Sequence, residues 1–194
     1  DDFDQYEPSD NSRTQDVNYN IIRVGDVLTE ALRSHGLEVL HDREIYDYPS
    51  YTGSYTRCGE SISRYLAEYP SIAIVIDVHR DAIETDGVRI KPTAVINGQK
   101  AAQLMIISGA DDGTMGMPAF WQNLRFAAAL QAAVEESCDG LTRPVLFDYR
   151  NYNQQLTTGS LLLEIGGHGN TLEEAKYTAR LVGQALAQLL RENA

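Results

Sequence analysis

A histidine, an arginine and a carboxylate follow an apolar run in the first half of the chain. Residues 72–76 are all isoleucine, valine or alanine, and His79, Arg80 and Asp81 come within the next five positions. This pattern predicts a strand buried on both faces of a parallel sheet. Ligands bind such sheets beyond the carboxyl ends of the strands. We therefore expect His79 to be a metal ligand or a proton carrier, unless it only ends the strand and hydrogen-bonds a neighbouring loop.

A glutamate ends a second apolar run. Residues 161–163 are leucines, Glu164 follows them, and three of the next five residues are glycine. A carboxylate that enters an apolar sheet has a raised pKa unless it is paired, and a raised pKa suits a general acid or base. If both strands are central neighbours in the sheet, His79 and Glu164 share one crevice. The alternative for Glu164 is a structural ion pair with an arginine.

The remaining histidines and the two cysteines give weaker signals. His35 suits a helix end, whereas His41 and His168 lie where they could reach the same crevice. No two histidines have the close spacing of a metal-binding pair. Cys58 and Cys138 are expected to be free thiols, with a disulfide between them or an activated Cys58 thiolate as the alternatives. Motifs for serine hydrolases, P-loops and dinucleotide binding are absent from the sequence.

Helical and extended patterns alternate along the chain. Helices are expected at residues 18–34, 60–68 and 120–138, and a final helix after a cap at Asn170 or Thr171. Strands are expected at residues 37–40, 71–81, 93–96, 101–107, 144–149 and 160–165. Asn97-Gly98 is the strongest hairpin signal, and most other connections are too long for hairpins. The order predicts one α/β domain over residues 1–194, with a mostly parallel central sheet flanked by helices and residues 1–16 as an arm or loop.

The loop expected at residues 42–59 is rich in tyrosine. Tyr46, Tyr48, Tyr51 and Tyr55 all lie in it. Each ring offers a flat apolar face and a hydroxyl group, so an exposed tyrosine suits contact with a sugar or a peptide. The alternative is that the rings pack the loop onto the domain.

The composition excludes some classes of partner. The formal net charge of −12 argues against nucleic acid or an anionic lipid surface, because both select basic proteins. No run approaches the roughly 20 apolar residues that a membrane span needs. The first residues also lack the pattern of a signal peptide.

Several segments, in one order from residue 13 to the final helix, carry a family resemblance. They are residues 13–16, 20–25, 48–57, 76–81, 152–156, 163–166 and 170–175. Together they resemble the stage II sporulation protein P (SpoIIP) family of spore-forming bacteria. That family is similar to zinc-dependent N-acetylmuramoyl-L-alanine amidases, and its members cut stem peptides from the glycan of peptidoglycan during engulfment. Some members are also described as cutting peptide cross-links.

The resemblance implies roles for three residues. His79 matches a zinc ligand, Glu164 matches the catalytic glutamate, and Asp16 matches the place of a glutamate ligand in related amidases. The family has a further ligand on a His-x-His strand that would precede Asp1, so the sheet is expected to lack its first strand. A hydrolytic zinc site needs three protein ligands and an open position for water. Zinc lowers the pKa of that water to about 7, and Glu164 would carry its proton to the leaving amine.

The resemblance also implies substrate contacts, partners and a location. Substrate-binding residues are expected to be Arg57, Arg80, Asn153, Gln154 and Tyr55. The implied partners are peptidoglycan, a SpoIID-type lytic transglycosylase and a SpoIIM-type membrane protein. The expected location is extracytoplasmic, at the sporulation septum, with a membrane anchor upstream of this sequence. Two alternatives to the amidase stay open, a zinc endopeptidase that cuts cross-links and an inactive wall-binding scaffold.

Overall fold

The computed structural model describes residues 14–193, and a four-stranded mixed sheet lies at its centre. The strand order is β1-β8-β6-β7. β1 (Val75–Asp81) runs parallel to β8 (Ser160–Gly167), and β6 (Leu104–Gly109) runs parallel to β7 (Leu146–Asp148), whereas β6 and β8 are antiparallel. Two of the three pairings are parallel, which confirms the expected α/β class with a mostly parallel sheet.

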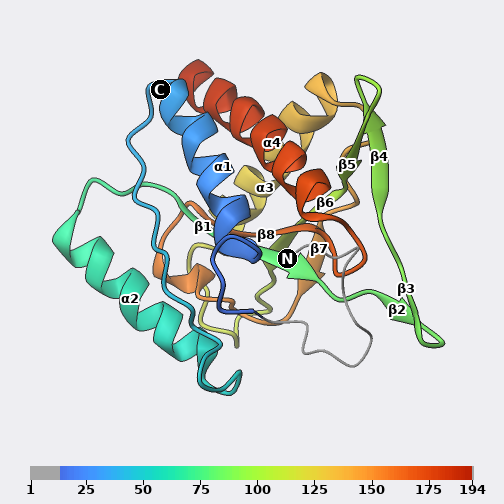
Figure 1. Cartoon of the computed structure of the whole chain (residues 1–194). Helices are drawn as coiled ribbons and strands as arrows, with labels where there is room; N and C mark the ends of the chain where they lie inside the picture. The colour runs from blue at the N-terminus through green and yellow to red at the C-terminus, as the bar shows by residue number, and fades with distance from the viewer. Residues whose placement is uncertain (1–13, 194) are drawn as a thin grey trace.

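Helices cover both faces of the sheet. α1 (Ile21–Ser34) and α4 (Leu172–Glu192) pack together on one face, and α3 (Phe120–Ser137) contacts α4 (Figure 1). Leu161, Leu163 and Ile165 of β8 belong to the apolar core with residues of these three helices. Because side chains alternate along a strand, Leu162 and Glu164 point to the other face. That face carries α2 (Ser54–Glu68), whose Tyr55 stacks on His79.

Caps and a glycine contact explain how α1 and α4 form and pack. The Asn20 side chain accepts a hydrogen bond from the backbone N–H of Ile22 at the start of α1. Thr171 and Glu174 form a capping box at the start of α4, as expected for the Thr171 cap. A Cβ atom at Gly183 would lie 2.6 Å from the Cβ of Ala31, so the two helices approach more closely than a larger side chain would permit.

Two small hairpins extend from the domain. β4 (Thr93–Ile96) and β5 (Gln99–Ala102) pair around Asn97 and Gly98, whose φ angles of 50° and 78° confirm the hairpin that the Asn-Gly signal predicts. β2 (Glu84–Thr85) and β3 (Val88–Arg89) pair around Asp86-Gly87, which also have positive φ angles. The sequence pattern did not predict this second hairpin.

Three local expectations were wrong. Residues 37–40 do not form a strand, because no other strand of the described chain pairs with them. β1 is an edge strand, paired with β8 alone among residues 14–193, and all seven of its residues are partly exposed rather than buried on both faces. α2 begins at Ser54, six residues earlier than expected, after Gly53 with its φ angle of 83°. Tyr55 therefore lies on a helix and not in the loop.

No helix in the described part of the chain combines the length and the apolar character that a membrane span requires. Both cysteines are free thiols, with Cys138 buried and Cys58 partly buried. Burial, together with the nearby carboxylates of Asp77 and Asp42, raises the pKa of the Cys58 thiol to about 12. That pKa opposes formation of a thiolate near neutral pH.

Candidate active site

His79 and Glu164 lie opposite one another on neighbouring strands. His79 of β1 is the register partner of Glu164 of β8 in their parallel pairing. Register partners of two paired strands point to the same face, so both side chains face the side on which α2 packs. The geometry brings together the two residues that the sequence pattern placed in one crevice.

His79 is held by one carboxylate and one aromatic ring. Its Nε2 lies 2.9 Å from Oδ1 of Asp77, which stands two residues earlier on β1 and so points to the same face. The ring of Tyr55 stacks on the imidazole at a centroid distance of 6.0 Å and an interplanar angle of 17°. Tyr152 packs edge-on against Tyr55 at 5.7 Å. These contacts fix the orientation of the imidazole.

The charges around His79 favour its protonated form. Burial alone would lower the pKa of the imidazole, but the hydrogen bond and the negative charge of Asp77 raise it above its ordinary value. The carboxylates of Glu164 and Asp47 add to this effect.

Glu164 has an unusual environment for a carboxylate. Its Oε2 atom is buried and has no hydrogen-bond partner. Burial raises the pKa of Glu164 to about 7, although the nearby positive charge of His79 opposes the shift. A carboxyl group with this pKa can take up and return a proton near neutral pH.

The structure shows no ion pair between Glu164 and an arginine in the described part of the chain. The positive charge of the Arg143 guanidinium lowers the pKa of Glu164, in opposition to burial. Its Nη2 instead donates to Oδ2 of Asp81 at 2.8 Å, which ties the end of β1 to the segment before β7. The alternative of a structural ion pair for Glu164 is therefore not seen.

A register shift follows the two residues directly. His79 pairs with Glu164, but Asp81 pairs with Gly167, so β8 has one extra residue at this point. Gly166 lies in the extra segment with a φ angle of 72°, and a Cβ there would lie 2.7 Å from the Cβ of Ala102. Only glycine fits this position without strain. Arg80 lies within the same irregular stretch, next to His79.

Two of the expected substrate contacts, Gln154 and Asn153, make hydrogen bonds within the fold. Gln154 is 1% exposed, accepts a hydrogen bond from the backbone N–H of Gly109 and donates one to the carbonyl of Ile107. A buried amide with both ends paired cannot reach a substrate, so that part of the expectation was wrong. Asn153 donates to the carbonyl of Tyr55, which ties its connection to α2, and it stays partly exposed.

Arg57 organises the tyrosine-rich loop. Its guanidinium donates hydrogen bonds to the backbone carbonyls of Tyr46, Ser50 and Thr52. These contacts tie the loop to the first turn of α2. Direct binding of a substrate by Arg57 and by Arg80 stays a prediction.

Asp16 is not brought into a metal site. Its Oδ1 accepts hydrogen bonds from the backbone and side chain of Asn18, in the turn before α1. Within residues 14–193 no group of three His, Cys, Asp or Glu side chains is arranged to hold a metal ion. The described residues therefore do not fit the complete three-ligand zinc site that the family resemblance implies.

Two carboxylates near His79, those of Asp77 and Asp47, were not among the site residues predicted from the sequence. Asp77 could have been found, because it stands two positions before His79 on an expected strand and so shares its face. Asp47 reaches this region through the path of residues 42–53, and no local pattern in the sequence indicates that path.

Comparisons with known proteins agree on one family. The family model described as stage II sporulation protein P (SpoIIP) matches residues 3–187. The stage II sporulation protein P of Bacillus subtilis (strain 168) is 27% identical over 181 residues, which are 88% of this chain and 43% of that protein. The chain thus spans less than half the length of this relative.

Two solved structures of amidases have a similar fold. The N-acetylmuramoyl-L-alanine amidase AmiC2 of Nostoc punctiforme gives a TM-score of 0.52 at 12% identity, over 89% of this chain and 81% of that one. The N-acetylmuramyl-L-alanine amidase Ami1 from Mycobacterium smegmatis gives 0.54 at 12% identity, over 94% and 82%. At this identity the likeness shows a shared α/β fold.

Proposed function

The chain belongs to the SpoIIP family of sporulation proteins, and from this premise we propose that it hydrolyses peptidoglycan. The bond cut is the amide between the lactyl group of N-acetylmuramic acid and the L-Ala of the stem peptide. The observation that carries the proposal is the pairing of His79 with Glu164, whose buried carboxyl group has a pKa of about 7. The amidase-like fold supports the same reaction class.

Glu164 is the general acid and base of the proposed reaction. Its carboxylate takes a proton from the attacking water and returns it to the nitrogen of the leaving L-Ala. A group with a pKa near 7 suits both steps, and such catalysis contributes roughly 10²- to 10⁴-fold to the rate. Asp77 positions His79 beside it, while Tyr55 and Arg80 are the proposed substrate contacts.

Zinc is the proposed cofactor, with His79 as one ligand. When bound in such a site, zinc polarises the scissile carbonyl and lowers the pKa of a bound water. Residues 14–193 do not bring three such ligands together in the arrangement described. The role of Asp16 as a ligand requires a different position of its side chain from the one described.

The biological setting follows from the family as a proposal. The substrate is the wall at the sporulation septum, outside the cytoplasm, and the partners are a SpoIID-type lytic transglycosylase and a SpoIIM-type membrane protein. The net charge of −12 opposes broad contact with an anionic wall. Recruitment by partners and a local substrate contact would overcome this repulsion.

Product analysis on purified peptidoglycan tests the proposal. The chain and a version extended towards the N-terminus are incubated with peptidoglycan and zinc, and the soluble products and bound zinc are measured. Intact stem peptides and glycan with free lactyl ends are expected from the extended version. Cleaved peptides would instead support the endopeptidase, and wall binding without zinc or products in either version would support the scaffold.

A further inference from the structure

The side chain of Asn170 lies inside the fold, next to the bulge that follows Glu164. Thr171 caps α4, so Asn170 precedes the cap and its carboxamide has other partners. Its Oδ1 accepts a hydrogen bond from the backbone N–H of Gly167 at 2.9 Å. Its Nδ2 donates to the carbonyl of Pro92 at 3.1 Å and to a carboxylate oxygen of α4 at 3.0 Å. One side chain thus joins the end of β8 to two other parts of the chain.

A closed ring of hydrogen bonds runs through the bulge. The backbone N–H of Gly166 donates to the carbonyl of Gln103 at 2.9 Å, and the N–H of Gln103 donates to the carbonyl of Pro92 at 3.0 Å. Asn170 connects Pro92 back to Gly167 and so completes the ring. We call these five residues the bulge clamp. Asn170 provides its side-chain link, and the other two hydrogen bonds join backbone groups.

A carboxamide has the chemistry that this position requires. The N–H of Gly167 needs an acceptor, whereas the carboxylate of Glu174, whose Oε2 bonds to Nδ2, needs a donor. Asparagine supplies both within one short side chain. Alanine would leave the Gly167 N–H without this partner, and aspartate would place a second carboxylate beside Glu174.

The bulge bears directly on the position of Glu164. Glu164 precedes Gly166 by two residues, and the register shift begins directly after it. The buried Oε2 of Glu164 has no hydrogen-bond partner, so no such bond holds that oxygen in place. Its position then depends on the backbone of residues 164–167. Bulges next to active sites commonly re-aim a side chain in this way.

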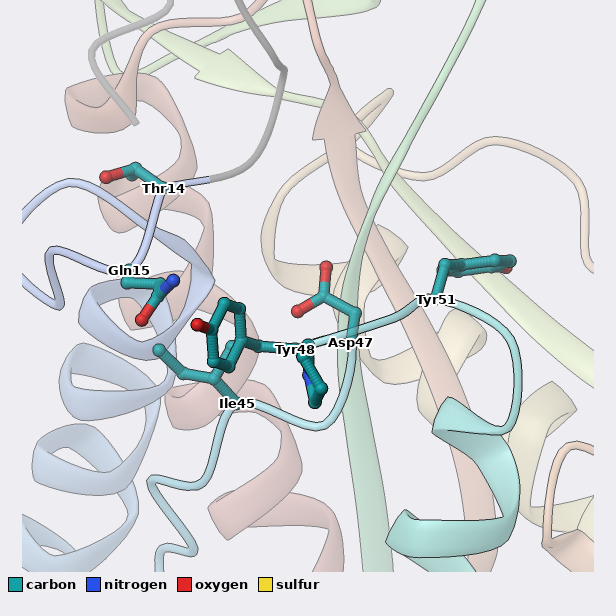
Figure 2. A pocket seen from close by; sticks show the side chains of 7 residues that line it. Thr14, Gln15, Ile45, Asp47, Tyr48 and Tyr51 are labelled. Carbon is teal, nitrogen blue, oxygen red and sulfur yellow. The ribbon is translucent and has the colours of Figure 1, made fainter.

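Asn170 offers no surface for direct contact with a ligand. It is 0% exposed, whereas Tyr48 and Tyr51, which line the pocket drawn in Figure 2, are each 57% exposed. That pocket of about 260 Å³ lies between residues 14–15 and the loop at 45–51. A buried carboxamide whose oxygen and nitrogen are both bonded within the fold acts on the backbone and not on a substrate.

We propose that Asn170 is a positioning residue, whose carboxamide fixes the bulge of β8 and so holds the carboxyl group of Glu164 beside His79. The inference rests on the proposed function for the catalytic role of Glu164. It rests on the contacts of Asn170 alone for the bulge clamp.

Hydrogen exchange and NMR of the chain test the bulge clamp without zinc or substrate. The N–H of Gly167 should exchange slowly in the unsubstituted chain, because its partner is buried. Asn170→Ala should speed this exchange about tenfold, as the loss of one buried hydrogen bond predicts, and should shift the signal of the Glu164 carboxyl carbon. Asn170→Asp keeps an oxygen towards Gly167 and should retain slow exchange. Thr171→Ala removes the neighbouring cap of α4 and should change neither signal.

Turnover of peptidoglycan by the N-terminally extended version with zinc gives the second readout. Asn170→Ala should lower kcat by up to about 100-fold and leave KM nearly unchanged, because a misplacement of about 1 Å can cost this much. Asn170→Asp should recover most of the lost kcat. Thr171→Ala is the matched control, since it also loses a hydrogen bond at the start of α4 but should retain kcat. Circular dichroism confirms that each variant is folded.

The outcomes separate the bulge clamp from the proposed function. Rapid exchange of the Gly167 N–H in the unsubstituted chain would overturn the clamp, whichever variants fold. An unchanged Glu164 signal in Asn170→Ala, or equal losses of kcat in Asn170→Ala and Thr171→Ala, would also overturn it. The expected NMR signals together with no products from the unsubstituted extended version would refute the proposed function and leave the clamp standing.

Discussion

β1 and β8 lie side by side and each carries one member of the proposed catalytic pair, yet their surroundings differ. β8 lies between β1 and β6, and all its residues except Glu164 are buried. β1 lies at the edge, and all seven of its residues are partly exposed. Glu164 itself is partly exposed, but its Oε2 atom is buried without a hydrogen-bond partner, and burial is the largest cause of its raised pKa. At His79 a specific partner, Asp77, raises the pKa against the effect of burial.

This difference shows two ways to tune a titratable group within one site. Burial of a carboxylate oxygen that has no hydrogen-bond partner raises the pKa of the carboxyl group. On an edge strand the protonation state of the histidine depends on a hydrogen bond from its own strand. The two strands should respond differently to substitution.

The largest effect is expected at the centre of β8. Glu164→Gln keeps the size of the side chain and removes its ability to carry a proton, so hydrolysis of peptidoglycan should fall roughly 10²- to 10⁴-fold in a version of the protein that is active. Release of stem peptides is the measurement. Glu38→Gln, at an exposed glutamate, is the matched control and should retain full activity. Retention of most activity by Glu164→Gln would remove this residue from the mechanism.

Truncation of apolar side chains compares the two strands directly. Leu163 of β8 is 0% exposed, so Leu163→Ala should lower the free energy of unfolding by about 2–5 kcal/mol. Val78 of β1 is partly exposed, so Val78→Ala should cost about 1 kcal/mol. Urea denaturation of both variants is the measurement. Equal losses would show that β1 is as buried as β8 in solution.

The pH dependence of stability should report the burial of Glu164. Its folded pKa of about 7 is above the ordinary value of 4.5, so the folded state binds the proton more tightly than the unfolded state. The stability that this residue contributes is present below pH 4.5 and is lost as the pH rises through 7. Glu164→Gln should therefore gain up to about 3 kcal/mol of relative stability at pH 8 compared with pH 4. A gain that does not depend on pH would contradict the shift.

The smallest effect is expected at the edge strand. Asp77→Asn keeps a hydrogen-bonding oxygen but removes the charge, so the pKa of His79 should fall, as NMR titration of its ring protons would show. Loss of this positioning contact should lower activity about 10-fold. Asp112→Asn, at an exposed loop carboxylate, is the control. An unchanged His79 pKa in Asp77→Asn would show that Asp77 does not tune the imidazole.

Features set by local chemistry were predictable from the sequence. The hairpin at Asn97-Gly98 and the cap at Thr171 follow from side chains and backbone angles within a few residues. The alanine-rich pattern predicted a helix at residues 120–138, and α3 spans Phe120–Ser137. His79 and Glu164 are aligned because each follows an apolar run on one of two strands that pair in parallel, although β1 is an edge strand and not a central one.

Features set by distant parts of the chain were not predictable. The apolar pattern of β1 indicates a strand but does not say how many neighbours it has. Local pattern is also insufficient for residues 37–40. Their sequence suits a strand, but in the described part of the chain no neighbouring strand pairs with them. Gln154 looked like a surface residue of a polar connection, and its burial depends on the backbone of β6, 45 residues earlier.

The open side of β1 also has a consequence for handling the protein. An edge strand is a template on which a further strand can pair, and charged side chains such as those of Asp77 and Asp81 limit which strands can do so. Within residues 14–193 no strand pairs with that side of β1. An extended peptide of suitable charge should therefore be able to lengthen the sheet at β1, which matters when such peptides are mixed with the chain.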